Sequence, residues 1–320
     1  MKTTTLVLVA GLGLLCACSD NRETETPDLS GVIRFESGIQ TKAGPVTGTQ
    51  FAAGTKVGVY TLENRNGVPV WTTSVSDASN NLIMNNVEAE VSGSGGLVYE
   101  PVKMYTANAN YSFFAYYPYE ASVTDPSAGQ PPKLACTFGK TPSDQIDYMY
   151  ASPLENKKPV TGAYLLSFNH ALTQVTVKVV NGTGDKLTLH SLKIQAPGGA
   201  TLNIGNGTWS APSGSETYIL FGPSAAEEIQ PKASFSVPGQ LMLLPVAAKG
   251  TAYTFDMGVT EGDASSAIEK TGQTLTLPTE GLRAGYSYEY TVTYGSASSI
   301  QLSTSVVEWQ YVSGPGITVK

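Results

Sequence analysis

Alternation of apolar and polar residues recurs along this 320-residue chain and constrains its fold more than any other feature. It is clearest over residues 286–294, where every second side chain is aromatic or apolar: Tyr286, Tyr288, Tyr290, Val292 and Tyr294. Successive side chains of a β-strand point to opposite faces, so this pattern predicts a strand with one buried face. Residues 175–179 and 253–257 alternate in the same way, and no convincing helical periodicity follows the N-terminal segment.

Turn-forming residues separate the alternating stretches. The chain contains 33 glycines and 19 prolines, and the pairs Asn66-Gly67, Asn181-Gly182 and Asn206-Gly207 mark tight turns. Only residues 143–151, with Ser143 as the N-cap, suggest a short helix. Many strands punctuated by turns predict an all-β fold.

Some of the predicted strands have a distinctive pattern. Residues 56–62 and 111–117 are largely apolar on both faces, which is typical of central strands that are covered on both sides. Residues 187–194 change phase between Leu189 and Leu192, which predicts a bulge or a strand break.

A polar, proline-terminated stretch indicates where the chain divides. It lies within residues 155–161, and an apolar pattern resumes at Tyr164. We therefore predict two β-sandwich domains in tandem, an N-terminal domain over residues 31–161 and a C-terminal domain over residues 162–320.

Residues 1–17 predict a lipoprotein signal peptide. An apolar run from Leu6 to Leu15 follows a basic start, and it is too short for a stable transmembrane helix. The sequence Leu15-Cys16-Ala17-Cys18 resembles the bacterial lipobox, in which a Leu three residues ahead and a small residue directly ahead precede the lipidated cysteine. Cys18 fits this pattern, so we expect a lipid on Cys18 to be the protein's only contact with the membrane. Residues 18–30 then form a polar tether.

Charge and composition exclude several classes of function. Nineteen Lys and Arg against 26 Asp and Glu give a net charge of −7, so the chain lacks the basic face that nucleic-acid binding needs. Two His and three Cys leave little material for a metal site, and we predict neither a metal nor a cofactor. If Cys18 is acylated, only Cys136 remains in the mature chain and no intramolecular disulfide can form.

No catalytic constellation emerges from the residue pattern. His170 stands at a strand without a local nucleophile or orienting acid, so we predict a structural histidine that hydrogen-bonds a neighbouring loop. Asp144 and Asp147 could act as a glycosidase pair, but acidic residues in the first turn of a helix explain them better. We predict no catalytic residue and no enzyme activity.

Tryptophans offer an alternative function. Trp71, Trp209 and Trp309 could stack on sugar rings, although packing in a core or an interface is the better explanation for each. The alternative is a monomeric surface glycan-binding lipoprotein that uses exposed aromatic residues such as Trp71.

Several segments along nearly the whole chain carry a family resemblance. They are the lipobox at Cys18, Ile33-Arg34-Phe35 with Thr41-Lys42-Ala43, Phe51 with residues 54–60, residues 111–119, residues 168–172, and residues 285–288. In order and spacing they resemble the fimbrillin family of Bacteroidetes, the lipoprotein pilins often called type V. The resemblance implies two transthyretin-like β-sandwich domains, no enzyme activity, and a structural subunit of a fimbria with a role in adhesion. It implies an outer-membrane precursor exposed at the cell surface, with other pilin subunits and a trypsin-like maturation protease as partners.

The resemblance also implies assembly by strand exchange. The protease removes the first strand of the N-terminal domain, and a C-terminal strand of the next subunit fills the groove that remains. Residues 31–42 match the removable strand, and the bond between Lys42 and Ala43 matches the cleavage site. Family members commonly carry Arg at this place, so an arginine-specific protease would cut poorly at Lys42.

The tail over residues 296–320 is the candidate donor strand, and its key residues are Ile300, Leu302, Val306, Val307 and Trp309. A sandwich that lacks one strand exposes apolar core and unpaired backbone groups, and an incoming strand satisfies both. The same residues fit the last strand of their own domain equally well, so both alternatives stay open.

Overall fold

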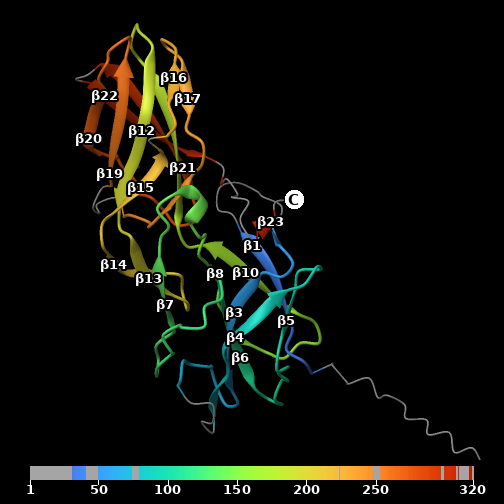
Figure 1. Cartoon of the computed structure of the whole chain (residues 1–320). Coiled ribbons are helices and arrows are strands. Elements are labelled where there is room, and N and C mark those ends of the chain that lie inside the picture. The colour runs from blue at the N-terminus through green and yellow to red at the C-terminus, as the bar shows by residue number, and fades with distance from the viewer. Residues whose placement is uncertain are drawn as a thin grey trace, which may run out of the picture. The chain divides into compact units, whose positions relative to one another are not determined.

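A computed structural model describes residues 31–40, 50–73, 79–222, 224–247, 253–296, 299–307, 309 and 317–318 (Figure 1). Gly31–Lys320 form one compact unit. The described residues form 23 strands and one three-residue 3-10 helix, η1 (Pro142–Asp144), which confirms the predicted all-β fold. Within these residues no helix has the length and apolar character needed to cross a membrane. The predicted signal peptide, the tether and Cys18 lie outside the described residues.

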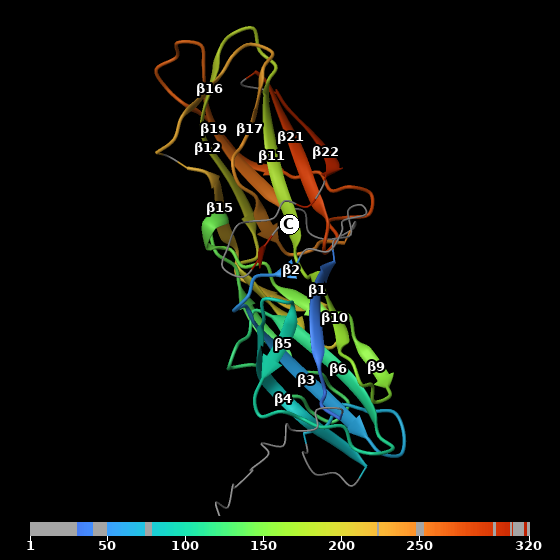
Figure 2. The same cartoon turned by 90° about the vertical axis from the view of Figure 1, so that its right-hand side faces the viewer.

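The N-terminal part of the unit is built around an eight-stranded sheet that closes on itself. Its strands are hydrogen-bonded in the order β3-β4-β5-β1-β10-β8-β6-β9, and β3 also pairs with β6. This extra pairing closes a ring, the N-terminal barrel, in which every strand except β9 has neighbours on both edges (Figure 2). The strands are β1 (Phe35–Gln40), β3 (Lys56–Asn64), β4 (Asn80–Val91), β5 (Gly96–Tyr99), β6 (Asn110–Tyr117), β8 (Met149–Ala151), β9 (Leu154–Lys157) and β10 (Tyr164–His170).

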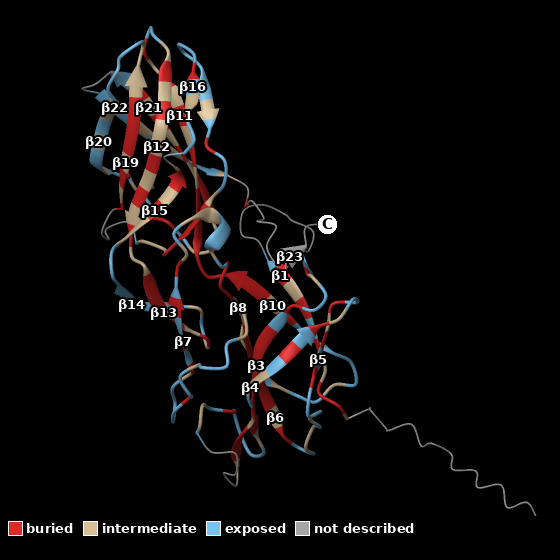
Figure 3. Cartoon of the chain, in the orientation of Figure 1, coloured by how far each residue is buried: buried red, intermediate tan, exposed pale blue. Residues whose placement is uncertain are grey.

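Strands β3 and β6 are buried over nearly their whole length (Figure 3). Their inner faces belong to the core of the barrel, whereas Tyr60 and Phe114 on the other faces join a second core cluster. Cys136 and Leu202 contribute to that cluster from a separate three-stranded sheet. Its strands are β7 (Lys133–Thr137), β13 (Gly199–Asn203) and β14 (Trp209–Ser213). The predicted central strands are thus confirmed.

The C-terminal sandwich consists of two sheets that share one core cluster. The first has the order β17-β11-β21-β22, with β18 also paired to β11, and the second has the order β15-β12-β19-β20, with β16 paired to β12. The first contains β11 (Thr173–Asn181), β17 (Ser234–Ser236), β18 (Leu241–Leu243), β21 (Ser287–Ser296) and β22 (Ser299–Val307). The second contains β12 (Leu187–Ala196), β15 (Glu216–Phe221), β16 (Glu227–Ile229), β19 (Thr254–Glu261) and β20 (Ile268–Thr274).

Strand β21 shows the predicted alternation in three dimensions. Tyr288, Tyr290, Val292 and Tyr294 are at most 1% exposed, and the residues between them from Glu289 to Thr293 are half-buried. Tyr286 stays half-buried just before the strand, with the Arg283 guanidinium 3.9 Å from its ring centroid. The predicted phase change in β12 is also present, because the register against β19 shifts between Leu189 and Ser191.

Elsewhere the structure corrects the sequence interpretation. The predicted helix over residues 143–151 is wrong: only η1 is helical, and Met149–Ala151 form strand β8. Met149 and Ala151 are buried in the barrel while Tyr150 faces the other way, and the strand pairs with β10. Tertiary burial on one face therefore overrides the local helical signal.

Sheets extend across the predicted division between residues 161 and 162. Strand β10 follows this point, yet it pairs with β1 and β8 of the barrel. Strand β7 precedes it, yet it pairs with β13. The chain passes from the barrel to the sandwich at residues 171–172, between β10 and β11. The division into two domains stays a prediction.

A short two-stranded sheet completes the described fold. It pairs β2 (Gln50–Phe51) with β23 (Ile317–Thr318) in antiparallel register. Residues 317–318, close to the end of the chain, therefore lie beside residues 50–51.

Candidate functional site

Strand β1 is a closing strand of the N-terminal barrel. It runs parallel to β10, with six residue pairs from Phe35↔Tyr164 to Gln40↔Asn169, and antiparallel to β5 on its other edge. Figure 2 shows β1 between these two strands. Loss of β1 would break the ring at one place and leave two unpaired edges facing each other across a slot.

The inward side chains of this first segment belong to the barrel core. Ile33, Phe35 and Ile39 are 0%, 2% and 4% exposed. The Phe35 ring lies 5.2 Å from the ring of Phe113 and 6.2 Å from that of Tyr99, measured between centroids. Burial of each such side chain contributes about 1.5–3 kcal/mol, so the empty slot would expose a large apolar surface.

The predicted processing site follows β1 directly. The strand ends at Gln40, two residues before Lys42. Lys42 and Ala43 themselves lie outside the described residues, and their role stays a prediction.

Four of the predicted donor residues lie in β22, an edge strand of the sandwich. The strand pairs only with β21 among the described strands, in antiparallel register from Ser287↔Val307 to Ser296↔Ser299. Ile300 and Leu302 pack against the core, whereas Val306 is 53% exposed. Charged side chains and prolines commonly protect an exposed sheet edge. Residues 299–307 contain neither. In this structure β22 is the last strand of its own sheet.

The fifth predicted donor residue, Trp309, is buried away from β22. Its side chain is 3% exposed and stacks on the His170 imidazole, with ring centroids 4.0 Å apart and an interplanar angle of 24°. His170 Nδ1 lies 2.6 Å from Asp147 Oδ2, and both side chains are buried. Trp309 thus contacts His170, although more than 130 positions separate the two residues in the sequence.

His170 hydrogen-bonds the segment before β8, as predicted for this residue. Asp144, the second member of the considered carboxylate pair, is exposed and accepts a 2.6 Å hydrogen bond from the Thr141 hydroxyl. The two aspartates therefore have different surroundings and do not form a matched acid pair. The sequence could not indicate the His170–Asp147 contact, because 23 residues separate the two and no pattern in the sequence links them.

The chain is similar to known proteins over most of its length. The fimbrillin-like family profile matches residues 41–309, which is more than half of the chain. The chain belongs to the fimbrillin-like family. The resemblance found in the sequence is thereby confirmed, while no curated protein sequence matches.

Solved structures agree with the fold of this fimbrillin-like protein. A candidate cell adhesion protein from Bacteroides ovatus is 14% identical, with a TM-score of 0.53 over 88% of this chain and 98% of that one. A candidate cell adhesion protein from Parabacteroides distasonis is 12% identical, with a TM-score of 0.53 over 89% of this chain and 98% of the other. At these identities the likeness shows a shared fold.

The remaining tryptophans of the fimbrillin-like chain serve in packing. The half-buried Trp71 ring lies 4.5 Å from the ring of Phe114 and 5.9 Å from that of Tyr60, between centroids. The indole N–H of Trp209 donates a 2.6 Å hydrogen bond to the carbonyl of Ala171. These contacts support the packing interpretation over sugar stacking.

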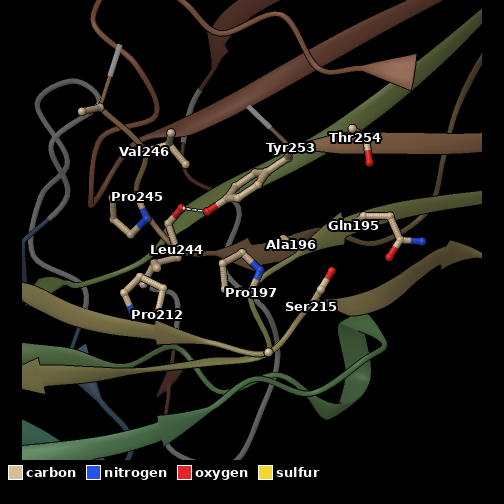
Figure 4. Close-up of a pocket in the computed structure, with 12 residues that line it drawn as sticks. Gln195, Ala196, Pro197, Pro212, Ser215, Leu244, Pro245, Val246, Tyr253 and Thr254 are labelled. Atoms are coloured by element: carbon tan, nitrogen blue, oxygen red, sulfur yellow. Dashed lines mark hydrogen bonds between the residues drawn. The ribbon is translucent and has the colours of Figure 1, made fainter. Parts of the chain in front are cut away.

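A pocket of 530 Å³ lies in the C-terminal sandwich, at the ends of β12 and β19 (Figure 4). Its lining is mainly apolar and includes Pro197, Pro212, Val246 and Tyr253, and no charged side chain lines it. The Tyr253 hydroxyl donates a 2.6 Å hydrogen bond to the Leu244 carbonyl, and burial raises the pKa of this phenol. The pocket offers apolar surface but no acid or base for chemistry.

One buried carboxylate stabilises the barrel. Burial disfavours the charged form of Glu63, but hydrogen bonds from Thr106, Asn81, Arg65 and Tyr111 outweigh it, and the pKa of Glu63 lies below its ordinary value. The Asn81 amide and the Tyr111 hydroxyl donate at 3.3 and 3.1 Å. This network holds β3, β4 and β6 together.

In the part of the chain that the structure describes, no group of three or more His, Cys, Asp or Glu side chains could hold a metal ion. Cys136 is free and buried, and burial raises the pKa of its thiol to about 12. A thiol held protonated at neutral pH is a poor nucleophile.

Proposed function

We propose that this protein is a structural subunit of a cell-surface fimbria, assembled by protease-triggered strand exchange and active in adhesion. The observation that carries the proposal is the place of β1. It closes the barrel from both edges, and the predicted cleavage site lies two residues beyond its end. After cleavage at Lys42, only non-covalent contacts would hold β1 in the slot.

The C-terminal segment 296–320 of a neighbouring subunit is the proposed replacement for β1. Among the described strands, β22 pairs with β21 alone, so it can leave its sheet at a lower cost than a strand paired on both edges. An incoming strand would restore the backbone hydrogen bonds and the apolar contacts of the slot. The partners are therefore other pilin subunits and a trypsin-like protease, and we propose no enzyme activity for the chain itself.

The proposed precursor is an outer-membrane lipoprotein anchored through Cys18. Replacement of Cys18 by Ala should abolish fatty-acid labelling and release the protein from the membrane fraction, whereas Cys16→Ala should leave both unchanged. Labelling that persists in Cys18→Ala and is lost in Cys16→Ala would overturn the assignment of the anchor.

Limited tryptic digestion of the chain from Ser19 onward tests the assembly route. The uncut precursor should be monomeric, and cleavage after Lys42 should be followed by polymers that survive mild detergent as a ladder of bands. Lys42→Gln should block both steps, whereas Lys158→Gln, a change at an exposed lysine in a loop of the same barrel, should block neither. A chain that ends before Ser296 should be cleaved normally and fail to polymerise.

Melting curves separate failed assembly from failed folding in the truncated chain. If that chain polymerises after cleavage as well as the full-length protein does, the C-terminal segment is not the donor. If the cleaved full-length protein stays monomeric, strand exchange itself is wrong.

A further inference from the structure

Trp309 stacks on a histidine ring whose position is fixed by its neighbours. His170 is the last residue of β10, and its backbone is fixed by pairing with Met149 of β8. The Asp147 carboxylate, 2.6 Å from Nδ1, holds the imidazole plane in place. A ring oriented in this way presents a flat face, and Trp309 covers it at a centroid distance of 4.0 Å. We name His170 and Asp147 the indole seat.

The indole seat lies at the end of the β1 slot. The last residue pair between β1 and β10 is Gln40↔Asn169, and His170 is the next residue along β10. The strand that fills the slot and the ring that fills the seat therefore occupy neighbouring positions on one strand. Any segment that enters the slot from this end passes the seat.

Trp309 also belongs to the proposed donor segment. It lies two residues beyond β22 and before β23, so a tail that leaves its own sandwich carries the indole away from its own seat. The departure would uncover the face of the His170 ring, which is 1% exposed with Trp309 in place. In domain swapping, an interaction that is broken within one chain is formed again between two chains. Here only the Trp309 contact would be formed again, because β22 takes the place of β1 and not of another β22.

We propose that, in the assembled polymer, the indole seat of each subunit binds Trp309 of the neighbouring copy whose tail fills the slot. The partner is a second copy of this chain, and the ligand is the indole of one tryptophan. The contact anchors the incoming tail at the mouth of the slot and limits its dissociation. This inference rests on the proposed strand exchange.

A mixed complex of two full-length copies, each starting at Ser19, tests the contact between chains. The acceptor is cut after Lys42 and carries Trp309→Ala, so its own tail cannot occupy its seat. The donor carries Lys42→Gln and a fluorescent label, so its slot stays closed and only its tail can bind. The rate at which labelled donor leaves the acceptor is measured by a chase with unlabelled donor.

Trp309→Ala in the donor should speed its dissociation roughly tenfold or more, as for a buried tryptophan at the centre of an interface, and Trp309→Phe should restore part of the loss. With His170→Ala in the acceptor, the donor that keeps Trp309 should dissociate as fast as the Trp309→Ala donor does from the unchanged seat, and a second substitution should add little. Strictly additive effects of the two substitutions would overturn the seat, because the two side chains would then not touch across the interface.

Two controls keep the outcomes distinct. Val68→Ala in the donor changes an exposed side chain outside the tail and should leave the dissociation rate nearly unchanged. Melting curves of each variant exclude loss of fold, and the coupling between the two sites is independent of any uniform destabilisation. If donor and cut acceptor form no complex at all, strand exchange fails and this inference fails with it. A complex without coupling overturns the seat alone.

Discussion

The N-terminal barrel and the C-terminal sandwich handle the edges of their sheets in opposite ways. In the barrel, the pairing of β3 with β6 closes the ring, so β1 is bound on both edges although it comes first in the fold. In the sandwich, β22 is the last strand and, among the described strands, it pairs on one edge only. Residues 299–307 have no charged side chain and no proline to protect the other edge. The contrast indicates which region can receive a strand and which can give one. A closed ring that loses a strand has a defined gap, whereas an open sheet that loses its edge strand has only a new edge.

The largest effect should come from side chains in the two exchanging strands. Phe35→Ala in β1 should lower the free energy of unfolding of the uncut chain by about 3–5 kcal/mol, because it opens a cavity beside Phe113. Val306→Ala in β22 should change it by no more than about 0.5 kcal/mol, because that side chain is 53% exposed. Chemical denaturation of both variants measures the difference. Equal losses would mean that β1 and β22 are held equally tightly, which would remove the basis of the contrast.

A smaller effect is expected from added methyl groups at tightly packed glycines. A Cβ at Gly58 of the barrel would lie 2.0 Å from the Tyr116 ring, whose hydroxyl is held by Asn86 Oδ1 at 2.8 Å. A Cβ at Gly258 of the sandwich would meet the end of the Glu269 side chain at 2.7 Å and the Ser191 hydroxyl at 2.8 Å, and both of these side chains can rotate away. Gly58→Ala should therefore cost about 1–3 kcal/mol and Gly258→Ala clearly less. Thermal unfolding of the pair provides the measurement, and a larger loss for Gly258→Ala would reverse the proposed difference in rigidity.

Acid should weaken the barrel through Glu63. The pKa of this carboxyl is lowered in the folded state, so its contribution to stability is fully present above the ordinary pKa of a Glu, about 4.3, and is lost as the pH falls through the folded value. Glu63→Gln should cost about 1–3 kcal/mol at pH 7, since a buried network loses its charged acceptor, and the gap to the unchanged protein should shrink toward pH 3. Amide hydrogen exchange, measured as a function of pH, compares the stability of β3 and β6 in the barrel with that of β12 and β19 in the sandwich. A gap that is constant with pH would show that Glu63 is not the titrating group.

The smallest effect should be that of a reducing agent. In a chain that starts at Ser19, Cys136 is the only cysteine, and it is free and buried. The melting temperature should be the same with and without reductant, because no disulfide within the chain can contribute. A shift with reductant would mean that disulfide-linked pairs of chains form and stabilise one of the two regions.

Local pattern in the sequence determined which residues form strands. The alternation over residues 286–294, the doubly apolar stretches 56–62 and 111–117, and the phase change near Leu189 all have their expected counterparts. A period of two reports directly on which side chains face the core, and it needs no knowledge of the partner strand. The helical signal over residues 143–151 failed for the complementary reason: burial of Met149 and Ala151 between distant strands decided the conformation of that segment.

Tertiary structure alone decided which strands are neighbours. The parallel pairing of β1 with β10 joins residues more than 120 positions apart, and the sequence of neither strand identifies the other as its partner. The same holds for the closing pair β3 and β6, for the contact of Trp309 with His170, and for the contact of His170 with Asp147. Backbone hydrogen bonding is the same for every residue type except proline. Alternation therefore specifies that a strand has a buried face, but not which strand it pairs with. Partner choice follows from the packing of the whole core, and the closed barrel, the open edge and the indole seat all arise at that level.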